Sequence, residues 1–194
     1  ERVIVRDEVT VGIGGDQVEA AIERLSVLAP LHREAAVLPK LVEALRALDY
    51  PAEKLDIKIV LEWDDIETRR AAAALRLGPP FEVVLAPPVA PRTKPKALNA
   101  ALALARGEFT VVFDAEDRPE PDQLRRALQA FARDDVTLAC VQARLTIDNS
   151  GDGWLARLFT AEYAGQFDVL LPGLAAFRLP LPLGGSSNHF RTAA

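Results

Sequence analysis

Residues 109–117 read Phe-Thr-Val-Val-Phe-Asp-Ala-Glu-Asp and give the clearest indication of the fold class. The first five residues form an apolar run of strand length, and three of the last four are acids. Similar apolar runs occur at 25–31, 57–61, 81–86 and 138–141, and consecutive runs begin between 24 and 32 residues apart. This interval is the size of a unit in which a strand, a crossover helix and the next parallel strand follow one another.

Helical spacing fills the intervals between these runs. Leu38, Leu41, Val42 and Leu45 follow the i, i+3, i+4, i+7 pattern, and the same spacing recurs at 98–105, ended by Gly107, and at 124–131. The strands are continuously apolar, which is typical of a parallel sheet covered on both faces. The sequence therefore predicts a three-layer α/β/α domain with a mostly parallel central sheet.

Composition excludes several classes of protein. The chain has 194 residues, of which 49% are hydrophobic, enough for one domain with a core. It carries 23 Lys and Arg against 28 Asp and Glu, a net charge of −5 that disfavours nucleic acid as a partner. Cys140, His32 and His189 are too few for a disulfide framework or a zinc site, so a metal would be held by oxygen.

The two ends of the chain raise separate expectations. Residues 1–24 are predicted to be a leader or an edge segment, with a turn at 12–15, and residues 25–194 to form the domain. The glycines of that turn lack the third glycine of a dinucleotide fingerprint. Because the chain starts at Glu1 and contains no methionine, we expect it to be part of a longer protein. Its longest apolar runs, such as 169–176, are far shorter than the roughly 20 residues of a membrane-spanning helix.

Charged residues follow the predicted strands at their carboxyl ends, where ligands collect in parallel α/β sheets. Glu34 follows the first strand, Asp64 and Asp65 follow the second, and an acidic stretch at 114–117 follows the fourth. Lys94 and Lys96 lie just before a predicted helix. Crowded carboxylates favour a divalent cation, and Mg²⁺ takes one or two carboxylates and completes its shell with phosphates. These residue types predict a metal-dependent site for a nucleotide diphosphate.

Four segments resemble glycosyltransferase family 2, in the order in which that family carries them. They are Val27-Leu28-Ala29-Pro30-Leu31-His32-Arg33-Glu34, Lys94-Pro95-Lys96-Ala97-Leu98-Asn99, Phe113-Asp114-Ala115-Glu116-Asp117 and Gly184-Gly185-Ser186-Ser187-Asn188-His189-Phe190-Arg191. The resemblance covers about residues 25–194 and is closest to membrane-bound bacterial β-glycan synthases, such as the cellulose synthase catalytic subunit. It implies a GT-A, Rossmann-like fold and transfer of a sugar from a nucleotide-diphosphate sugar, with inversion, to a glycan.

The resemblance also implies roles for individual residues. Glu34, Asp64 and Asp65 would contact the donor nucleotide, expected to be that of a UDP-sugar, and Lys94, with Lys96 as a second cation, would approach the diphosphate. Asp114 opens the family's Asp-x-Asp metal motif for Mg²⁺ or Mn²⁺, and either Glu116 or Asp117 could complete it. The region of the sugar or acceptor would include Gln142, Ser187, Asn188, His189 and Arg191.

This sequence departs from the family at the catalytic base. Relatives carry a later Thr-Glu-Asp motif, whose aspartate deprotonates the acceptor, and a Gln-x-x-Arg-Trp motif, and neither occurs here. We expect both beyond Ala194, so the chain alone would bind donor and transfer little sugar. The resemblance places the parent protein at the cytoplasmic face of the bacterial inner membrane, embedded through segments outside this soluble chain.

Other interpretations stay open. The chain could be a non-catalytic module that binds a nucleotide diphosphate. A nucleotidyltransferase would carry a glycine-rich, arginine-containing loop after the first strand, which His32-Arg33-Glu34-Ala35 is not. Individually, Asp64 and Asp65 could cap a helix, the acids at 114–117 could form an ordinary turn, and both lysines could be solvated.

An aromatic segment at 153–171 predicts a helix. Its side chains could pack into a core or against a part of the protein outside this chain, which we favour, or rest on a membrane surface. Cys140 is expected to be a small buried apolar residue.

Overall fold

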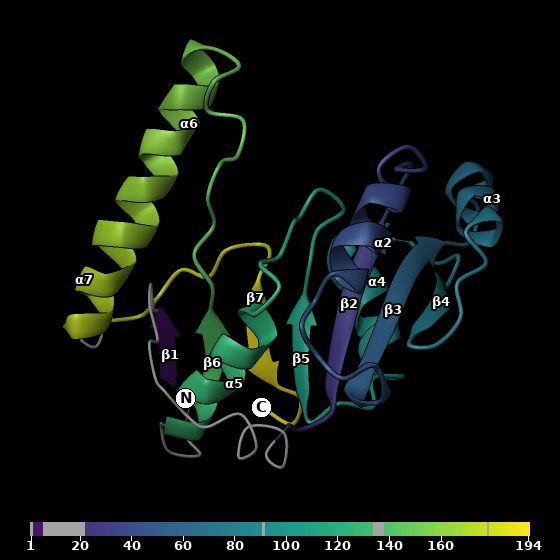
Figure 1. Ribbon diagram of the computed structural model, residues 1–194, viewed down its shortest axis with the longest axis horizontal. Helices are drawn as coiled ribbons and strands as arrows, with labels where there is room; N and C mark the ends of the chain where they lie inside the picture. Colours follow the sequence, from purple (N-terminus) through teal and green to yellow (C-terminus); the bar gives the residue numbers. More distant parts are fainter. Residues whose placement is uncertain (1, 6–21, 91, 134–137, 178) are drawn as a thin grey trace.

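The computed structural model describes residues 2–5, 22–90, 92–133, 138–177 and 179–194 (Figure 1). Among these residues, the strands are β1 (Arg2–Val5), β2 (Leu25–Leu31), β3 (Leu55–Glu62), β4 (Phe81–Ala86), β5 (Phe109–Val112), β6 (Leu138–Gln142) and β7 (Asn188–Arg191). The helices are α2 (Leu38–Arg46), η1 (Ala52–Lys54), α3 (Ile66–Ala74), α4 (Lys94–Leu102), α5 (Gln123–Arg133), α6 (Trp154–Ala164), η2 (Gly165–Leu170) and α7 (Leu171–Ala176). The turn expected at 12–15 lies outside the described residues.

The strands form one seven-stranded sheet in the order β1-β6-β7-β5-β2-β3-β4. Neighbouring strands pair in parallel except β7, which is antiparallel to both β5 and β6. The predicted α/β class and the mostly parallel sheet are confirmed. The edge strand β1 belongs to the segment expected to be a leader or an edge.

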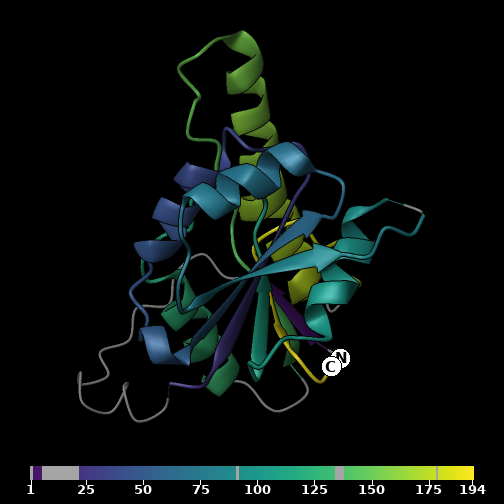
Figure 2. The same ribbon diagram turned by 90° about the vertical axis from the view of Figure 1, so that its right-hand side faces the viewer.

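Helices cover both faces of the sheet because side chains alternate along each strand. Val27, Ala29 and Leu31 of β2 join a core cluster with residues of α2, α3 and α5. Leu28 points the other way, into a smaller cluster with Ala97 and Ala101 of α4. The result is the expected three-layer arrangement, with helices on opposite sides of the sheet (Figure 2).

The helix with the lysines begins earlier than the apolar spacing indicates. That spacing predicts a helix over 98–105, but α4 spans Lys94–Leu102. Pro95 lies in its first turn, where the missing N–H costs nothing. Lys94 is therefore the first residue of the helix and not part of the loop before it.

A buried polar cluster secures the end of the sheet where β2 and β3 begin. The Asp56 carboxylate, 1% exposed, accepts hydrogen bonds from the Ser26 hydroxyl at 2.9 Å and from Arg106 Nε at 3.0 Å, and it pairs with Lys58 Nζ at 3.0 Å. Gly107 passes so close that a Cβ there would lie 2.4 Å from the Ser26 backbone nitrogen. This close approach requires glycine.

The predicted aromatic helix forms but is largely exposed. α6, the π-helical turn η2 and α7 follow one another without a break, and α6 extends away from the sheet (Figures 1 and 2). Phe167 and Leu171 are buried, whereas Trp154 is 77% exposed and Phe159 is 45% exposed. Packing against the core of this chain therefore involves only the C-terminal part of the segment, η2 and α7.

Part of the fourth family-like segment forms a strand. Residues Asn188–Arg191 of that segment are β7, and Ser187, with a φ of 56°, turns the chain into it.

None of the described helices is both long and apolar enough to cross a membrane.

Candidate functional site

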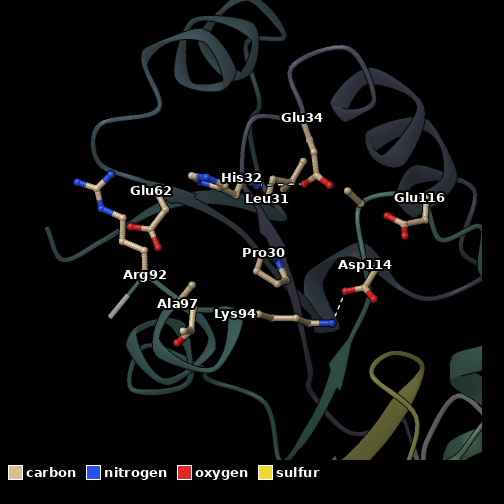
Figure 3. Close-up of a pocket in the computed structure, with 12 residues that line it drawn as sticks. Pro30, Leu31, His32, Glu34, Glu62, Arg92, Lys94, Ala97, Asp114 and Glu116 are labelled. Atoms are coloured by element: carbon tan, nitrogen blue, oxygen red, sulfur yellow. Dashed lines mark hydrogen bonds and ion pairs between the residues drawn. The ribbon is translucent and has the colours of Figure 1, made fainter. Parts of the chain in front are cut away.

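A pocket of about 330 Å³ opens at the carboxyl ends of β2, β3 and β5. β2 lies between the other two strands in the sheet, so the three strand ends meet there. Figure 3 shows the lining side chains, which come from these ends and from the start of α4. The lining residues are Pro30, Leu31, His32, Glu34, Glu62, Arg92, Thr93, Lys94, Ala97, Asp114, Ala115 and Glu116.

A sharp turn after β2 delivers Glu34 to the pocket. Arg33 has a positive φ of 61°, and its backbone N–H donates to Asp65 Oδ2 at 2.5 Å. Glu34 Oε2 then accepts the backbone N–H of His32 at 3.0 Å. Glu34 is thus held at the pocket by the turn itself.

Lys94 and Asp114 form the central ion pair of the pocket (Figure 3). Asp114 follows β5 and Phe113, and Lys94 begins α4 on the other side of the pocket. Lys94 Nζ bonds to Asp114 Oδ1 and donates to the carbonyl oxygen of Gly185 at 2.6 Å. Both side chains remain about one-third exposed, so a ligand in the pocket can reach them.

The acids of the 114–117 turn point in different directions. Asp114 and Glu116 line the pocket. Asp117 Oδ2 instead accepts the backbone N–H of Asp114 at 2.8 Å and the Ser186 hydroxyl. Burial raises the pKa of Asp117 despite these hydrogen bonds. Asp117 therefore stabilises the turn on the side away from the pocket, and of the acids of this turn only Asp114 and Glu116 line the pocket.

Lys96 is engaged outside the pocket lining. Its Nζ lies 3.0 Å from Glu62 Oε2 and donates to the carbonyl oxygens of Pro87 at 3.0 Å and Val89 at 3.2 Å. Glu62 itself lines the pocket and is 6% exposed. Lys96 thus neutralises a buried acid of the pocket wall and fixes the turn after β4.

Asp65 caps helix α3, and Asp64 lies on the surface. Asp65 Oδ1 accepts the backbone N–H of Thr68 at 3.1 Å, the usual geometry of an N-cap. Burial of Asp65 raises its pKa, but hydrogen bonds from Thr68 and Arg33 outweigh this effect and hold the pKa below the ordinary value. Asp64 pairs with Arg92 at 2.5 Å. Neither aspartate lines the pocket, although Arg92, the partner of Asp64, does.

Gln142 holds the 184–187 loop behind the pocket. This side chain, 0% exposed, accepts the backbone N–H of Gly184 at 2.9 Å and donates to the carbonyl oxygen of Ser186 at 3.0 Å. Asn188 Nδ2 donates to the Gly184 carbonyl at 2.6 Å. The loop presents the Gly185 carbonyl to Lys94. Gln142 does not line the pocket itself but positions the loop that contacts Lys94.

The remaining residues predicted around the sugar or acceptor lie in the sheet or the turn before it. His189 is 1% exposed, and its ring meets that of Phe113 edge-on at 6.4 Å. Burial lowers the pKa of His189 to about 4. Arg191 donates to the carbonyl oxygen of Leu138 and stacks on Phe109. Ser187 is buried in the turn before β7.

Of the residues singled out from the sequence, the structure brings four together at the pocket. They are Glu34, Lys94, Asp114 and Glu116. Glu62 and Arg92 also line the pocket and were not among the residues predicted from the sequence, although both stand in charged stretches, at the end of β3 and before α4. Gly185 was included only through the fourth motif, because a backbone carbonyl leaves no signal in sequence.

Asp114 and Glu116 together suit only a metal site that a ligand completes. The described residues contain no group of three or more His, Cys, Asp or Glu side chains that could hold an ion. Asp114 and Glu116 would supply two carboxylates, within the one or two that Mg²⁺ takes from protein when substrate phosphates complete its shell. The residues present fit a cation that arrives with a phosphate-bearing ligand.

Solved structures with the same architecture define the class of the domain. Glucosyl-3-phosphoglycerate synthase from Mycobacterium tuberculosis, in complex with Mn²⁺, UDP and glucosyl-3-phosphoglycerate, matches 99% of this chain and 64% of its own, with a TM-score of 0.61 and 17% identity. A mannosyltransferase from Pyrobaculum calidifontis, in complex with GDP-Man and Mn²⁺, matches 62% of this chain and 35% of its own, with a TM-score of 0.54 and 30% identity. The fold is that of GT-A glycosyltransferases.

The family follows from the sequence comparisons. The model of "Glycosyl transferase family 2" matches residues 26–186, and the chain belongs to this family. The beta-monoglucosyldiacylglycerol synthase of Synechocystis sp. is 32% identical over 154 residues, which are 77% of this chain and 31% of the relative. The probable glycosyltransferase YdaM of Bacillus subtilis is 26% identical over 73% of this chain and 34% of its own. The chain spans about a third of the length of these relatives.

Proposed function

We propose that this chain is the donor-binding part of a glycosyltransferase that transfers a sugar from a nucleotide-diphosphate sugar with inversion. The observation that carries the proposal is the convergence of Lys94, Asp114 and Glu116 in one pocket at the carboxyl ends of parallel strands. Ligands of open α/β sheets bind at that edge. A lysine opposite two acids suits a diphosphate accompanied by a cation.

Four of the pocket residues have a proposed task. Asp114 and Glu116 would hold Mg²⁺ or Mn²⁺, which would supply positive charge to offset that of the departing diphosphate. Lys94 donates hydrogen bonds to the diphosphate, and Glu34 faces the nucleoside. The Mn²⁺ in the mannosyltransferase complex, whose sequence is 30% identical over the shared region, supports the divalent ion.

The residues outside the pocket support it indirectly. Asp65 shapes the turn that carries Glu34, Lys96 holds Glu62, and Asp117 closes the acidic turn. Inverting transfer needs a general base, worth about 10²–10⁴-fold in rate. We assign that role to no described residue and therefore expect this chain alone to transfer sugar slowly.

Two classes of acceptor have support. The family resemblance favours a growing glycan. The Synechocystis relative carries glucosyldiacylglycerol in its name, which makes a lipid the second candidate. In either case we propose that the parent protein acts at the cytoplasmic face of a bacterial inner membrane.

Calorimetry tests the donor site directly. UDP, GDP and CDP are titrated into the chain with Mn²⁺, with Mg²⁺ and with a chelator. We expect one nucleoside diphosphate to bind only when the divalent ion is present. Equal binding in chelator would exclude the metal role, and no binding of any of the three would exclude the donor site. Binding without transfer or donor hydrolysis by the full-length protein would favour a non-catalytic module.

A further inference from the structure

Lys94 already occupies the carboxylate that the proposed cation requires. Its ammonium bonds to Asp114 Oδ1 and to the Gly185 carbonyl at 2.6 Å. A divalent ion on the same carboxylate would stand a few ångströms from the ammonium, and two positive charges at that distance repel. The ion pair and the metal complex are therefore competing states of Asp114.

The position of Lys94 permits an exchange between these states. Its backbone is fixed as the first residue of α4, whereas its four-carbon side chain is flexible and one-third exposed in the pocket. The 184–187 loop has other anchors, since Gln142 holds both Gly184 and Ser186. Release of the Gly185 carbonyl by Lys94 therefore leaves the loop in place.

We infer that Lys94 is an internal stand-in for the divalent cation at Asp114, displaced by that cation and transferred to the donor diphosphate. This inference rests on the proposed function. It adds how the charge of Asp114 is neutralised before the donor binds, and how metal and donor then enter the site. While the pocket is empty, the ammonium neutralises Asp114. When metal and nucleotide enter together, the metal takes the carboxylate and the phosphates take the ammonium.

The exchange makes metal and nucleotide binding mutually reinforcing. A phosphate that attracts Lys94 removes the competitor of the metal, and a metal that displaces Lys94 frees a donor group for the phosphate. Such coupling is reciprocal, so each ligand raises the affinity for the other by the same factor. Without Lys94, part of this factor is lost.

Lys40 provides a control of the same charge. It is exposed on α2 and does not line the pocket. Removing Lys40 changes the net charge as removing Lys94 does. It leaves every carboxylate of the pocket with its partners, whereas removal of Lys96 would free Glu62 of the pocket wall.

The test is calorimetric titration of Mn²⁺, without nucleotide, into the unsubstituted chain, Lys94→Met and Lys40→Met. We expect Lys94→Met to bind Mn²⁺ about two- to fivefold more tightly, the equivalent of one partly exposed ion pair, and Lys40→Met to show no change. With Mn²⁺ present, Lys94→Met should bind UDP, or whichever nucleoside diphosphate the unsubstituted chain binds, about tenfold more weakly or worse. Circular dichroism checks the fold, and Lys94→Gln, which removes the charge but keeps a donor for Gly185, should repeat the result.

The outcomes separate this inference from the proposed function. Mn²⁺ affinity that is unchanged, lowered or undetectable in both Lys94 variants, while the nucleotide with Mn²⁺ binds the unsubstituted chain, overturns the exchange alone. An equal rise in Lys40→Met also overturns it, because the effect is then one of net charge. If the unsubstituted chain binds no Mn²⁺ even with nucleotide, the metal role fails and the exchange fails with it.

Discussion

Asp114 is the residue on which the proposed metal site of the pocket depends. Its carboxylate is one-third exposed at the end of β5 and faces Lys94 across the pocket. Asp114→Asn keeps the size of the side chain and removes its charge. We expect the metal-dependent part of nucleotide binding to fall about tenfold or more, as is typical when a charged contact is lost.

Calorimetry with and without chelator measures this loss. Asp148→Asn is the matched control, because Asp148 is an exposed acid that pairs with Arg118 outside the pocket. Metal-dependent binding retained in full by Asp114→Asn would remove the residue from the metal site.

His189 gives the protein a predictable sensitivity to acid. Burial lowers the pKa of His189 from 6.5 to about 4, so between these values the unfolded chain binds a proton that the folded chain does not. The stability that depends on neutral His189 is complete above pH 6.5 and is lost as the pH falls toward 4. The expected loss between pH 7 and pH 5 is about 2 kcal/mol.

Urea unfolding at both pH values tests this effect. In His189→Leu the loss should be smaller by that amount, whereas His32→Leu, at the exposed rim of the pocket, should keep it. The same pH dependence in His189→Leu as in the unsubstituted chain would show that His189 is not its source.

At the scale of single elements, the N-cap residue of α3 connects this helix to the turn that carries Glu34. Asp65 accepts from Thr68 in the helix and from Arg33 in the turn that positions Glu34. Asp65→Ala should lower the free energy of unfolding by about 1 kcal/mol, the typical value of an N-cap. Asp64→Ala, at the neighbouring exposed residue, should change it by less than about 0.5 kcal/mol.

The acidic range provides a second check on this cap. The pKa of Asp65 is held below 3.8 in the folded chain, so its stabilisation is present above that pH and disappears as the pH falls through the folded pKa. The difference between the unsubstituted chain and Asp65→Ala should shrink accordingly. A constant difference down to pH 2 would contradict the capping role of the ionised carboxylate.

Gly107 joins α4 to β5 through a close approach of backbones. A Cβ at this position would lie 2.4 Å from the nitrogen of Ser26 and 2.6 Å from the carbonyl oxygen of Phe109, neither of which can rotate away. We expect Gly107→Ala to destabilise the chain by about 2 kcal/mol or more in chemical unfolding. Gly151→Ala, with nothing within 4 Å of the added carbon, should be close to neutral.

At the scale of the whole molecule, the α6–α7 segment divides into an exposed part and an anchored part. Leu158 is 55% exposed on α6, and Leu171 is fully buried at the start of α7. Leu171→Ala should cost about 2–5 kcal/mol and Leu158→Ala less than about 0.5 kcal/mol in chemical unfolding. A large cost at Leu158 would indicate that α6 is packed in solution.

Most strands of the sheet can be predicted from the sequence, because a run of apolar residues is a local property of the chain. The run 25–31 matches β2, and 81–86 matches β4, residue for residue. The antiparallel β7 was missed, because pairing between Val112 and Asn188 depends on residues far apart in the chain.

The same distinction applies to the pocket. Lys94, Asp114 and Glu116 could be selected because charged residue types mark strand ends. The direction of Asp117 could not, since its partner Ser186 lies 69 residues away. Likewise, the residues around Asp64 and Asp65 fit both a nucleotide contact and a helix cap, and only the hydrogen bond to Thr68 shows that Asp65 forms the cap.

The place of β7 in the sheet governs when folding can be completed. Among the strands that the structure describes, β1 and β6 are hydrogen-bonded to the rest of the sheet only through β7, which comes last of them in the sequence. During synthesis, β5 and β6 must therefore keep their facing edges unpaired until Asn188–Arg191 has left the ribosome. A chain that terminated before this point would have two further open β edges besides those of β1 and β4, and such edges are templates for aggregation.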